Sequence, residues 1–212
     1  MPAAIDAERR TGGRTLDSTR DADIRAAVLE LLAEQGYDRL TIEAVAARAR
    51  AGKATIYRRW PSKVELVLDA VNDLKPTDFE LPDTGNLADD IRAYFEVAAV
   101  GGPPNAFPLI AGLAPALLHD QELAAAFREH FVGPRIAKLQ FLLDRAVARG
   151  EVDTRRDADL LCAVFPAFML HRTVFGSEVP DADYARRIVE EVLIPLATAP
   201  SPRSPHPKRG HR

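Results

Sequence analysis

Several features are scarce in this 212-residue chain, and each absence argues against a class of protein. It has one cysteine, Cys162, which excludes an internal disulfide framework and any site built from several cysteines. The N-terminus carries Arg9, Arg10 and Arg14 without an apolar run behind them, so we expect no signal peptide. No apolar run approaches the ~20 residues that cross a bilayer. We therefore expect a cytoplasmic protein with no membrane attachment.

Catalytic motifs are missing as well. The chain contains no nucleophile elbow, P-loop, HExxH sequence or glycine-rich dinucleotide loop. His119, His130 and His171 lack the helical spacing of metal ligands. We therefore expect neither an enzyme nor a bound cofactor or metal, and an all-α enzyme stays open only as the least favoured alternative.

Acidic residues are absent from one stretch in particular. Between Val45 and Lys63 there is none, and this stretch holds six basic residues, namely Arg48, Arg50, Lys53, Arg58, Arg59 and Lys63. From Val64 to Pro202, by contrast, the chain has 22 acidic residues and only 12 basic ones. This asymmetry indicates that one face of one region meets nucleic acid. Charge runs are usually solvated faces, so charge alone does not decide the matter.

Capping residues and apolar spacing predict helices at the start of the chain. Ser18 with Asp21 three positions later forms a capping box, and Gly36 is a natural end for the helix that follows. Residues 1–17 read as a flexible basic arm. Such an arm can lie in a minor groove, but an inert tail fits the sequence at least as well.

A helix-turn-helix unit follows. Thr41 is a good N-cap for a second helix, and the short turn Arg50-Ala51-Gly52 leads to a third helix from Lys53 to about Trp60. Pro61 ends that helix, and the Ser62–Glu65 capping box opens a fourth helix that runs to Leu74. We expect residues 18–75 to form a DNA-binding domain. Ile42, Val45, Ile56 and Trp60 are expected in its core.

The rest of the chain shows further helical periodicity and no two-residue alternation, so the predicted fold is all-α with about nine helices. Residues 87–199 are expected to form a second helical domain, and residues 200–212 a disordered tail. Within this second domain, Gly133-Pro134 is expected to bend or interrupt a long helix, and Pro166 to kink another. The predicted helices cover residues 87–100, 105–118, 120–149, 157–175 and 181–197.

The N-terminal third resembles the DNA-binding domain of the tetracycline-repressor (TetR) family. The resemblance rests on the segments 32–37 (LAEQGY), 41–46 (TIEAVA) and 53–63 (KATIYRRWPSK). Family members usually have glycine where Arg50 stands and a serine N-cap where Gly52 stands. A positive φ at Arg50 would cost ~1 kcal/mol, and we expect Gly52 to compensate if it takes over the backbone freedom.

The resemblance also implies which residues meet DNA. Thr41, Tyr57 and Lys63 would position the protein on phosphates, and residues on or near the third helix would read base edges. Arg59 could instead be merely solvated, and Tyr57 partly core. The predicted DNA-binding residues are Thr41, Lys53, Ala54, Thr55, Tyr57, Arg58, Arg59 and Lys63.

In this family the C-terminal half dimerises and holds a small-molecule pocket. The resemblance thus implies a homodimeric repressor that an apolar or aromatic effector releases from a palindromic double-stranded operator. An effector-independent DNA-binding dimer is the alternative. We expect the helices at 157–175 and 181–197 to form the dimer seam. Each candidate pocket residue could equally be plain core, and the candidates are Phe95, Phe107, Leu113, Leu117, Phe127, Phe131, Leu143, Phe165, Phe168, Met169 and Arg172.

Overall fold

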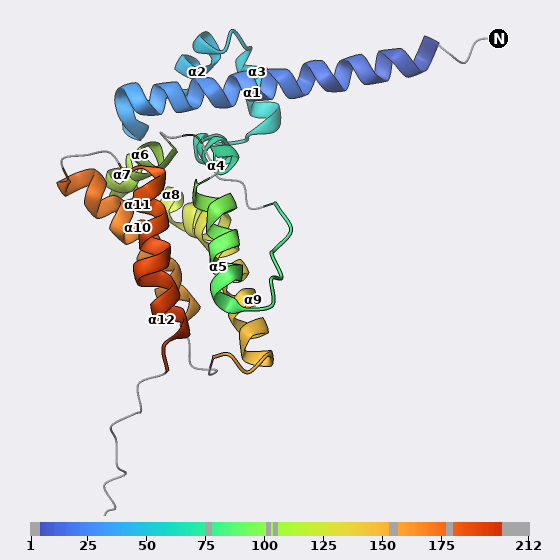
Figure 1. The fold of residues 1–212 in the computed structure, drawn as a ribbon. Coiled ribbons are helices and arrows are strands. Elements are labelled where there is room, and N and C mark those ends of the chain that lie inside the picture. Colours follow the sequence, from blue (N-terminus) through green and yellow to red (C-terminus); the bar gives the residue numbers. More distant parts are fainter. Residues whose placement is uncertain are drawn as a thin grey trace, which may run out of the picture. The chain divides into compact units, whose positions relative to one another are not determined.

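The computed structural model describes residues 5–74, 78–100, 103, 106–152, 157–176 and 180–200, with side chains from Thr19 onward. All regular elements in these ranges are helices, which confirms the all-α prediction (Figure 1). Met1–Ala4 and the expected disordered tail from Ser201 lie outside the described residues.

The chain divides into two compact units. The first comprises residues 1–79 and 102–134, and the second comprises residues 80–101 and 135–212. Residues 102–134 thus group with the N-terminal helices. The division predicted from the sequence, which places 87–199 in one domain, stays a prediction.

Helix α1 spans Ile5–Arg39, so it begins well before Ser18 (Figure 1). The predicted helix start is therefore wrong, and residues 5–17, expected as an irregular arm, are helical. No proline interrupts this segment, and its alanine, glutamate and arginine residues favour a helix. At the other end Gly36 has a φ of 77° and a non-helical ψ, so the regular helix ends there as predicted.

Helices α2 (Ile42–Arg48), α3 (Lys53–Arg59) and α4 (Lys63–Leu74) complete the predicted helix-turn-helix region. The Ser62 hydroxyl accepts a hydrogen bond from the Glu65 N–H at 3.1 Å and so caps α4. The four residues expected in the core, Ile42, Val45, Ile56 and Trp60, are buried. So are the apolar residues of α4, namely Val64, Leu66, Val67, Leu68, Ala70, Val71 and Leu74. Each buried valine, leucine or isoleucine side chain contributes ~1.5–3 kcal/mol.

Three short helices extend this core. They are α6 (Ala106–Ala111), α7 (Ala114–His119) and α8 (Gln121–Phe127). Leu113, Leu123 and Phe131 are buried in the same apolar cluster as the inward faces of α1 to α4. The first unit is therefore the helix-turn-helix region with three additional helices packed into its core.

Gly133-Pro134, expected to bend or interrupt a long helix, does not interrupt it. Helix α8 continues through a π-helical turn, η2 (Arg128–Val132), into α9 (Gly133–Ala148). Pro134 has no N–H to donate to the carbonyl of His130, four residues back. That carbonyl instead accepts a hydrogen bond from Asn72 Nδ2 of α4 at 3.3 Å. A widened turn and a substitute donor thus allow the helix to pass a proline.

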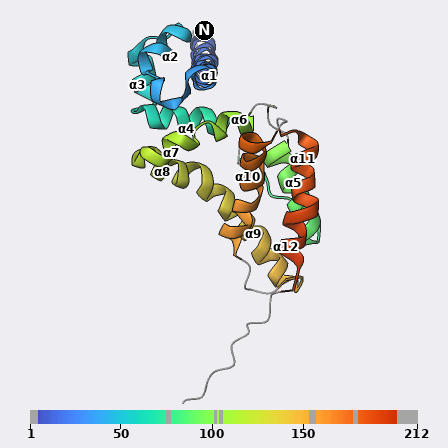
Figure 2. The ribbon, with the colours of Figure 1, turned by 90° about the vertical axis from the view of Figure 1, so that its left-hand side faces the viewer.

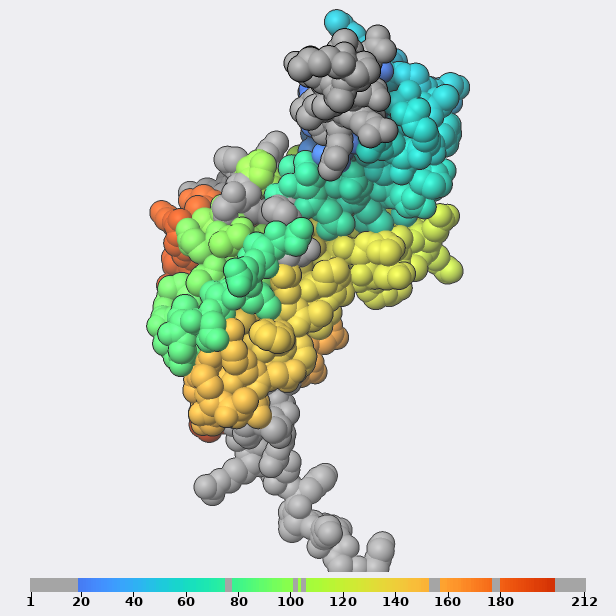
Figure 3. Space-filling view, turned by 90° about the vertical axis from the view of Figure 1, so that its right-hand side faces the viewer, coloured from blue at the N-terminus to red at the C-terminus, as the bar shows by residue number. Residues whose placement is uncertain are grey.

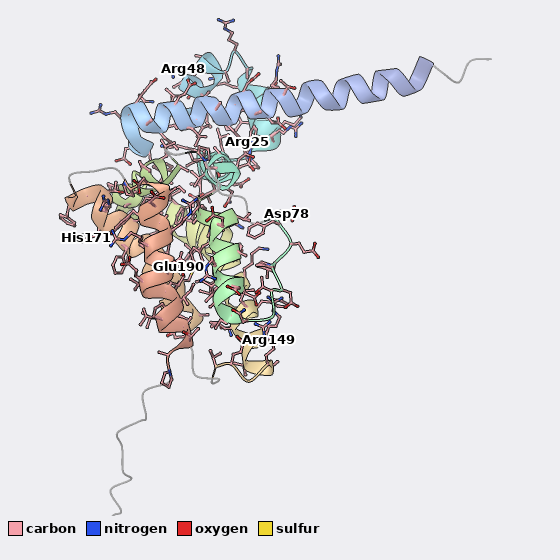
Figure 4. All side chains as sticks on the ribbon, in the orientation of Figure 1. Arg25, Arg48, Asp78, Arg149, His171 and Glu190 are labelled. Atoms are coloured by element: carbon pink, nitrogen blue, oxygen red, sulfur yellow. The ribbon has the colours of Figure 1, made fainter. Side chains whose placement is uncertain are left out.

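The second unit contains α5 (Leu87–Phe95), most of α9, α10 (Ala158–Phe175) and α11 (Ala182–Ile188) (Figure 2). Helix α5 continues into the π-helical turn η1 (Glu96–Val100), and α11 continues through η3 (Val189–Leu193) into α12 (Ile194–Thr198). Helix α10 runs through Pro166 without a break. Arg92 donates to Glu190 at 2.9 Å across α5 and η3, and Figure 4 shows Glu190 on the side facing α5.

A buried carboxylate organises the base of this unit. Asp90 is fully buried, and it accepts hydrogen bonds from the Thr84 N–H at 2.7 Å, from Arg145 at 2.7 Å and from Arg149 at 3.0 Å. Burial by itself raises the pKa of Asp90, but the hydrogen bonds from Thr84, Arg149 and Arg145 outweigh it and lower the pKa to about 2. Asp90 therefore stays ionised and links α5 to α9.

Candidate nucleic-acid interface

The turn of the helix-turn-helix is built on an unusual residue. Thr41 caps α2 as predicted, because its hydroxyl accepts from the Ala44 N–H at 3.1 Å. At the other end of α2, the Arg50 N–H bonds to the Ala47 carbonyl at 3.3 Å and the Ala51 N–H to the Ala46 carbonyl at 2.9 Å. These two bonds make a Schellman motif, whose C′ residue adopts a left-handed conformation.

Arg50 occupies that left-handed position, with a φ of 49°. The positive φ considered from the sequence is therefore present, at a cost of ~1 kcal/mol for a residue with a side chain. Gly52 has a φ of −74° and a ψ of 139°, an ordinary extended conformation. The expected compensation is thus wrong, because Gly52 does not take over the backbone freedom that the turn requires.

Helix α3 has one buried face and one open face. Ile56 is fully buried and Trp60, just beyond the helix, is nearly so. Ala54, Tyr57 and Arg58 are exposed, and Tyr57 retains 49% of its surface. Figure 3 shows the cyan segment of α2 and α3 at the surface of the first unit. Helix α3 can therefore present a basic, hydroxyl-bearing face to a groove.

Carboxylates from neighbouring helices engage much of the positive charge. Lys53 forms an ion pair with Glu43 of α2 at 2.9 Å, and this hydrogen bond raises the pKa of Lys53 and lowers that of Glu43. Arg48 donates to Glu30 at 3.0 Å and to Glu34 at 2.8 Å, both on α1. Figure 4 shows Arg48 on the α2 side of α1. The stretch without acids in the sequence is thus partly neutralised in the fold.

The C-terminal end of α3 is anchored to α1 and α4. Arg59 forms an ion pair with Asp21 of α1 at 2.7 Å, and Asp21 is nearly buried. Trp60 Nε1 donates to Asp69 of α4 at 3.0 Å. Asp69 also accepts from Arg25 of α1 at 3.2 Å, and Figure 4 shows Arg25 on the α4 side of α1. These carboxylates, which sequence reasoning missed, fix the position of the recognition helix.

Lys63 lies at the start of α4 in a sheltered place. Its ammonium is 4.0 Å from the centre of the Tyr37 ring, and burial lowers its pKa. The Tyr37 hydroxyl lies 3.4 Å from a carboxylate oxygen of Asp120, the N-cap of α8. Burial, with the nearby charge of Asp120, raises the pKa of Tyr37. Lys63 thus connects the interface to the helices that extend the first unit.

The predicted pocket residues fall into two groups. Phe107, Leu113, Leu117, Phe127 and Phe131 belong to the first unit. Leu113 and Phe131 are buried in the apolar cluster that also holds the inward faces of α1 to α4, and Leu117 and Phe127 pack against it. The Phe127 and Phe131 rings stack with their centres 4.6 Å apart.

The remaining candidates lie in the second unit. Phe95, Leu143, Phe165 and Met169 are buried there, and the rings of Phe95 and Phe165 are 5.1 Å apart. Phe168 keeps 41% of its surface, and Arg172 lies over the ring of Tyr184 at 4.3 Å. Of the four buried residues, Phe95 and Phe165 are in ring contact, whereas Phe168 lies at the surface.

Comparison with known proteins decides the family. Residues 24–70 match the model described as bacterial regulatory proteins, tetR family, and residues 81–192 match the tetracyclin repressor-like C-terminal domain. The chain belongs to the TetR family. It is a helix-turn-helix transcriptional regulator, and because this family consists of regulators, the expectation that it is not an enzyme is confirmed.

Individual TetR-family relatives agree over most of their length. An uncharacterised HTH-type transcriptional regulator of Mycobacterium tuberculosis is 38% identical over 85% of this chain and 89% of its own. The DNA-binding transcriptional repressor TetR of Mycobacteroides abscessus is 38% identical over 84% of this chain and 94% of its own.

Solved structures share the fold. GusR of Salmonella enterica covers 85% of this chain and 94% of its own with a TM-score of 0.65 at 17% identity. The TetR-family repressor FadR of Thermus thermophilus, solved in complex with lauroyl-CoA, covers 88% of this chain and 98% of its own with a TM-score of 0.60 at 18% identity. At these identities the likeness concerns the fold alone.

Proposed function

We propose that this regulator is a homodimeric repressor that binds a palindromic operator through α3 and is released by a small apolar effector. The observation that carries the proposal is the open face of α3, where Ala54, Tyr57 and Arg58 are exposed above a fully buried Ile56. A recognition helix enters the major groove in this way, with its first residues toward the base edges.

Specific roles follow for the interface residues. Thr41, Tyr57 and Lys63 contact phosphates, since each offers a hydroxyl or ammonium group at an edge of the motif. Lys53 and Arg58 donate to guanine, and Ala54 and Thr55 pack against thymine methyl groups. We do not propose a DNA contact for Arg59, because its ion pair with Asp21 at 2.7 Å holds the end of α3 against α1.

Dimerisation is supported by the surface of α10. This 18-residue helix has a mean hydropathy of 1.4, and only 22% of it is buried. By length and composition alone such a helix could also cross a membrane. Its exposed apolar residues include Leu160, Val174 and Phe175, and the exposed alanines Ala163 and Ala167 allow close helix approach. A second copy of α10, with α11 and α12 beside it, would cover this face.

The dimer is tested by placing charge on that face. Ala167→Arg with Val174→Asp should convert the dimer to a monomer, measured by light scattering after gel filtration, and should abolish tight operator binding. Leu118→Arg is the matched control, because Leu118 is 82% exposed on α7 and lies outside the seam. A double variant that remains a dimer would overturn the assignment of the seam.

The effector is proposed to occupy the second unit. The buried residues Phe95, Leu143, Phe165 and Met169 suit an apolar chain or ring. The lauroyl-CoA bound to FadR makes long acyl thioesters the first class to test. A ligand lowers DNA affinity only by as much as it prefers the conformer that cannot span two adjacent grooves, ~34–36 Å apart.

The packing of Leu113 and Phe131 into the DNA-binding core favours a second candidate, an effector-independent dimer. Mass spectrometry of molecules that co-purify with the protein, followed by thermal-shift titration with lauroyl-CoA, separates the two. Under the main proposal a ligand raises Tm and releases a bound operator duplex. A chain that binds no such ligand, or keeps the operator when a ligand binds, supports the alternative.

Operator binding is tested with duplexes selected from a random library and with the region upstream of the chain's own coding sequence. We expect a salt-sensitive complex with a palindrome, two protomers per duplex. The absence of any sequence-specific complex would overturn the proposed function. Cytoplasmic location follows from this role and is proposed with it.

A further inference from the structure

Arg50 is the one basic residue between Val45 and Lys63 that has neither a partner in the described part of the fold nor a proposed contact with DNA. Among the described residues it alone has a positive φ without being glycine. Glycine adopts that conformation without steric cost, so an arginine there stores strain in the turn. Strained residues that the surroundings hold in place gather at functional sites, which makes Arg50 a candidate for function.

The side chain of Arg50 is also uncommitted. The neighbouring cations Arg48, Lys53, Arg59 and Lys63 each engage a carboxylate or an aromatic ring. Arg50 is exposed, and its guanidinium forms no hydrogen bond or ion pair with the part of the chain that the structure describes. Among the basic residues from Arg48 to Lys63, Arg58 is the other one that is exposed and forms no hydrogen bond or ion pair with the described residues. These two arginines can bind an anion without first leaving a partner.

The location of Arg50 indicates that the anion is a phosphate of the DNA backbone. It follows the last turn of α2 and stands three residues before Lys53, the first residue of α3. In a helix-turn-helix the first helix crosses the phosphate backbone while the start of the second enters the groove. A residue of the connecting turn therefore lies beside the backbone that α2 crosses, and an arginine there meets phosphate oxygens.

We propose that Arg50 is a phosphate-contacting residue of the operator interface, beyond the residues implied by the family resemblance. The inference rests on the proposed DNA-binding mode and deepens it. Arg50 adds affinity without reading sequence, since phosphates carry no base information. The unusual arginine at a glycine position thereby has a physical reason, because the DNA complex uses the charge that the free turn must hold in a strained conformation.

The test compares Arg50→Gln with Arg50→Lys. Both variants keep a long side chain at the positive φ, so they share the strain and differ in charge. Loss of one phosphate contact reduces the salt slope by about 1 per protomer, which weakens binding at 0.15 M salt about fivefold per contact and about 30-fold for a dimer. We expect Arg50→Gln to lose this affinity equally on the selected palindrome and on a non-specific duplex. Arg50→Lys should keep the wild-type slope.

Two further variants complete the design. Arg50→Gly should also lose affinity, while its Tm stays at or above that of the wild type, because glycine relieves the strain. Arg128 is an exposed arginine of the first unit that lies outside α1 to α4. Arg128→Gln should therefore change neither the DNA affinity nor the Tm.

The outcomes separate this inference from the proposed function. Wild-type protein that binds no duplex overturns both. Wild-type binding with an unchanged affinity and salt slope in Arg50→Gln overturns the role of Arg50 alone. A loss confined to the palindrome would show base reading rather than phosphate contact and would also overturn it.

Discussion

Arg59 at the end of the recognition helix and Asp21 on α1 form an ion pair of 2.7 Å, with Asp21 retaining only 7% of its surface. The sequence places these residues 38 positions apart and assigns Arg59 to DNA. In the fold Arg59 holds α3 against α1. The position of α3 therefore depends on an ion pair between its C-terminal end and α1.

The first prediction concerns this pair. Arg59→Gln should lower the free energy of unfolding by about 1–3 kcal/mol, because it leaves the nearly buried carboxylate of Asp21 without its counterpart. Asp21→Asn should lower it less, because Arg59 keeps 33% of its side-chain surface and solvent can screen its charge. A double-mutant cycle by urea denaturation measures the coupling. Coupling within about 0.3 kcal/mol of zero would contradict the anchoring role.

The second prediction separates Arg58 from its neighbour. Arg58 is exposed and forms no ion pair with the described residues, so Arg58→Ala should change stability by less than about 0.5 kcal/mol. It should nevertheless weaken operator binding and alter base preference at one position in each half-site. Selection of preferred duplexes by the variant checks this, and an unchanged preference would remove Arg58 from the reading face.

The third prediction concerns the indole of Trp60. Trp60→Phe keeps most of the buried ring but removes the Nε1 hydrogen bond to Asp69. The loss should cost about 1–2 kcal/mol of stability. Tyr57→Phe is the matched control, since Tyr57 is 49% exposed and its hydroxyl forms no hydrogen bond with the residues that the structure describes. This variant should leave Tm unchanged. Equal Tm values for the two variants would show that the hydrogen bond from Trp60 to Asp69 does not stabilise the fold.

The fourth prediction concerns acid. The pKa of Asp90 is about 2 in the folded protein against an ordinary value of 3.8, so the folded state favours the ionised carboxylate. The lowered pKa contributes about 2 kcal/mol to the free energy of unfolding. This contribution is fully present above pH 4 to 5 and is lost as the pH falls toward 2. The stability difference between wild type and Asp90→Asn should shrink over that range. A difference independent of pH would show that the ionised form is not what stabilises the unit.

Much of the interface follows from local sequence. Thr41 and Ser62 cap their helices as predicted, and Gly36 ends α1, because capping depends on residues within a few positions. Local signals fail where another element intervenes. The helix passes Pro134 because Asn72, on a different helix, supplies the hydrogen bond that the carbonyl of His130 needs.

The sequence by itself determined an all-α chain with an N-terminal helix-turn-helix and the apolar residues that fill its core, since periodicity, caps and breakers are local properties. Only the tertiary structure decided which charges of that motif remain available. Glu30, Glu34, Glu43 and Asp21 lie outside the stretch without acids, and folding brings them onto its cations. An ion pair depends on distance in space rather than along the chain. For that reason the number of basic residues overstated the free positive charge, which the fold concentrates on Arg50 and Arg58.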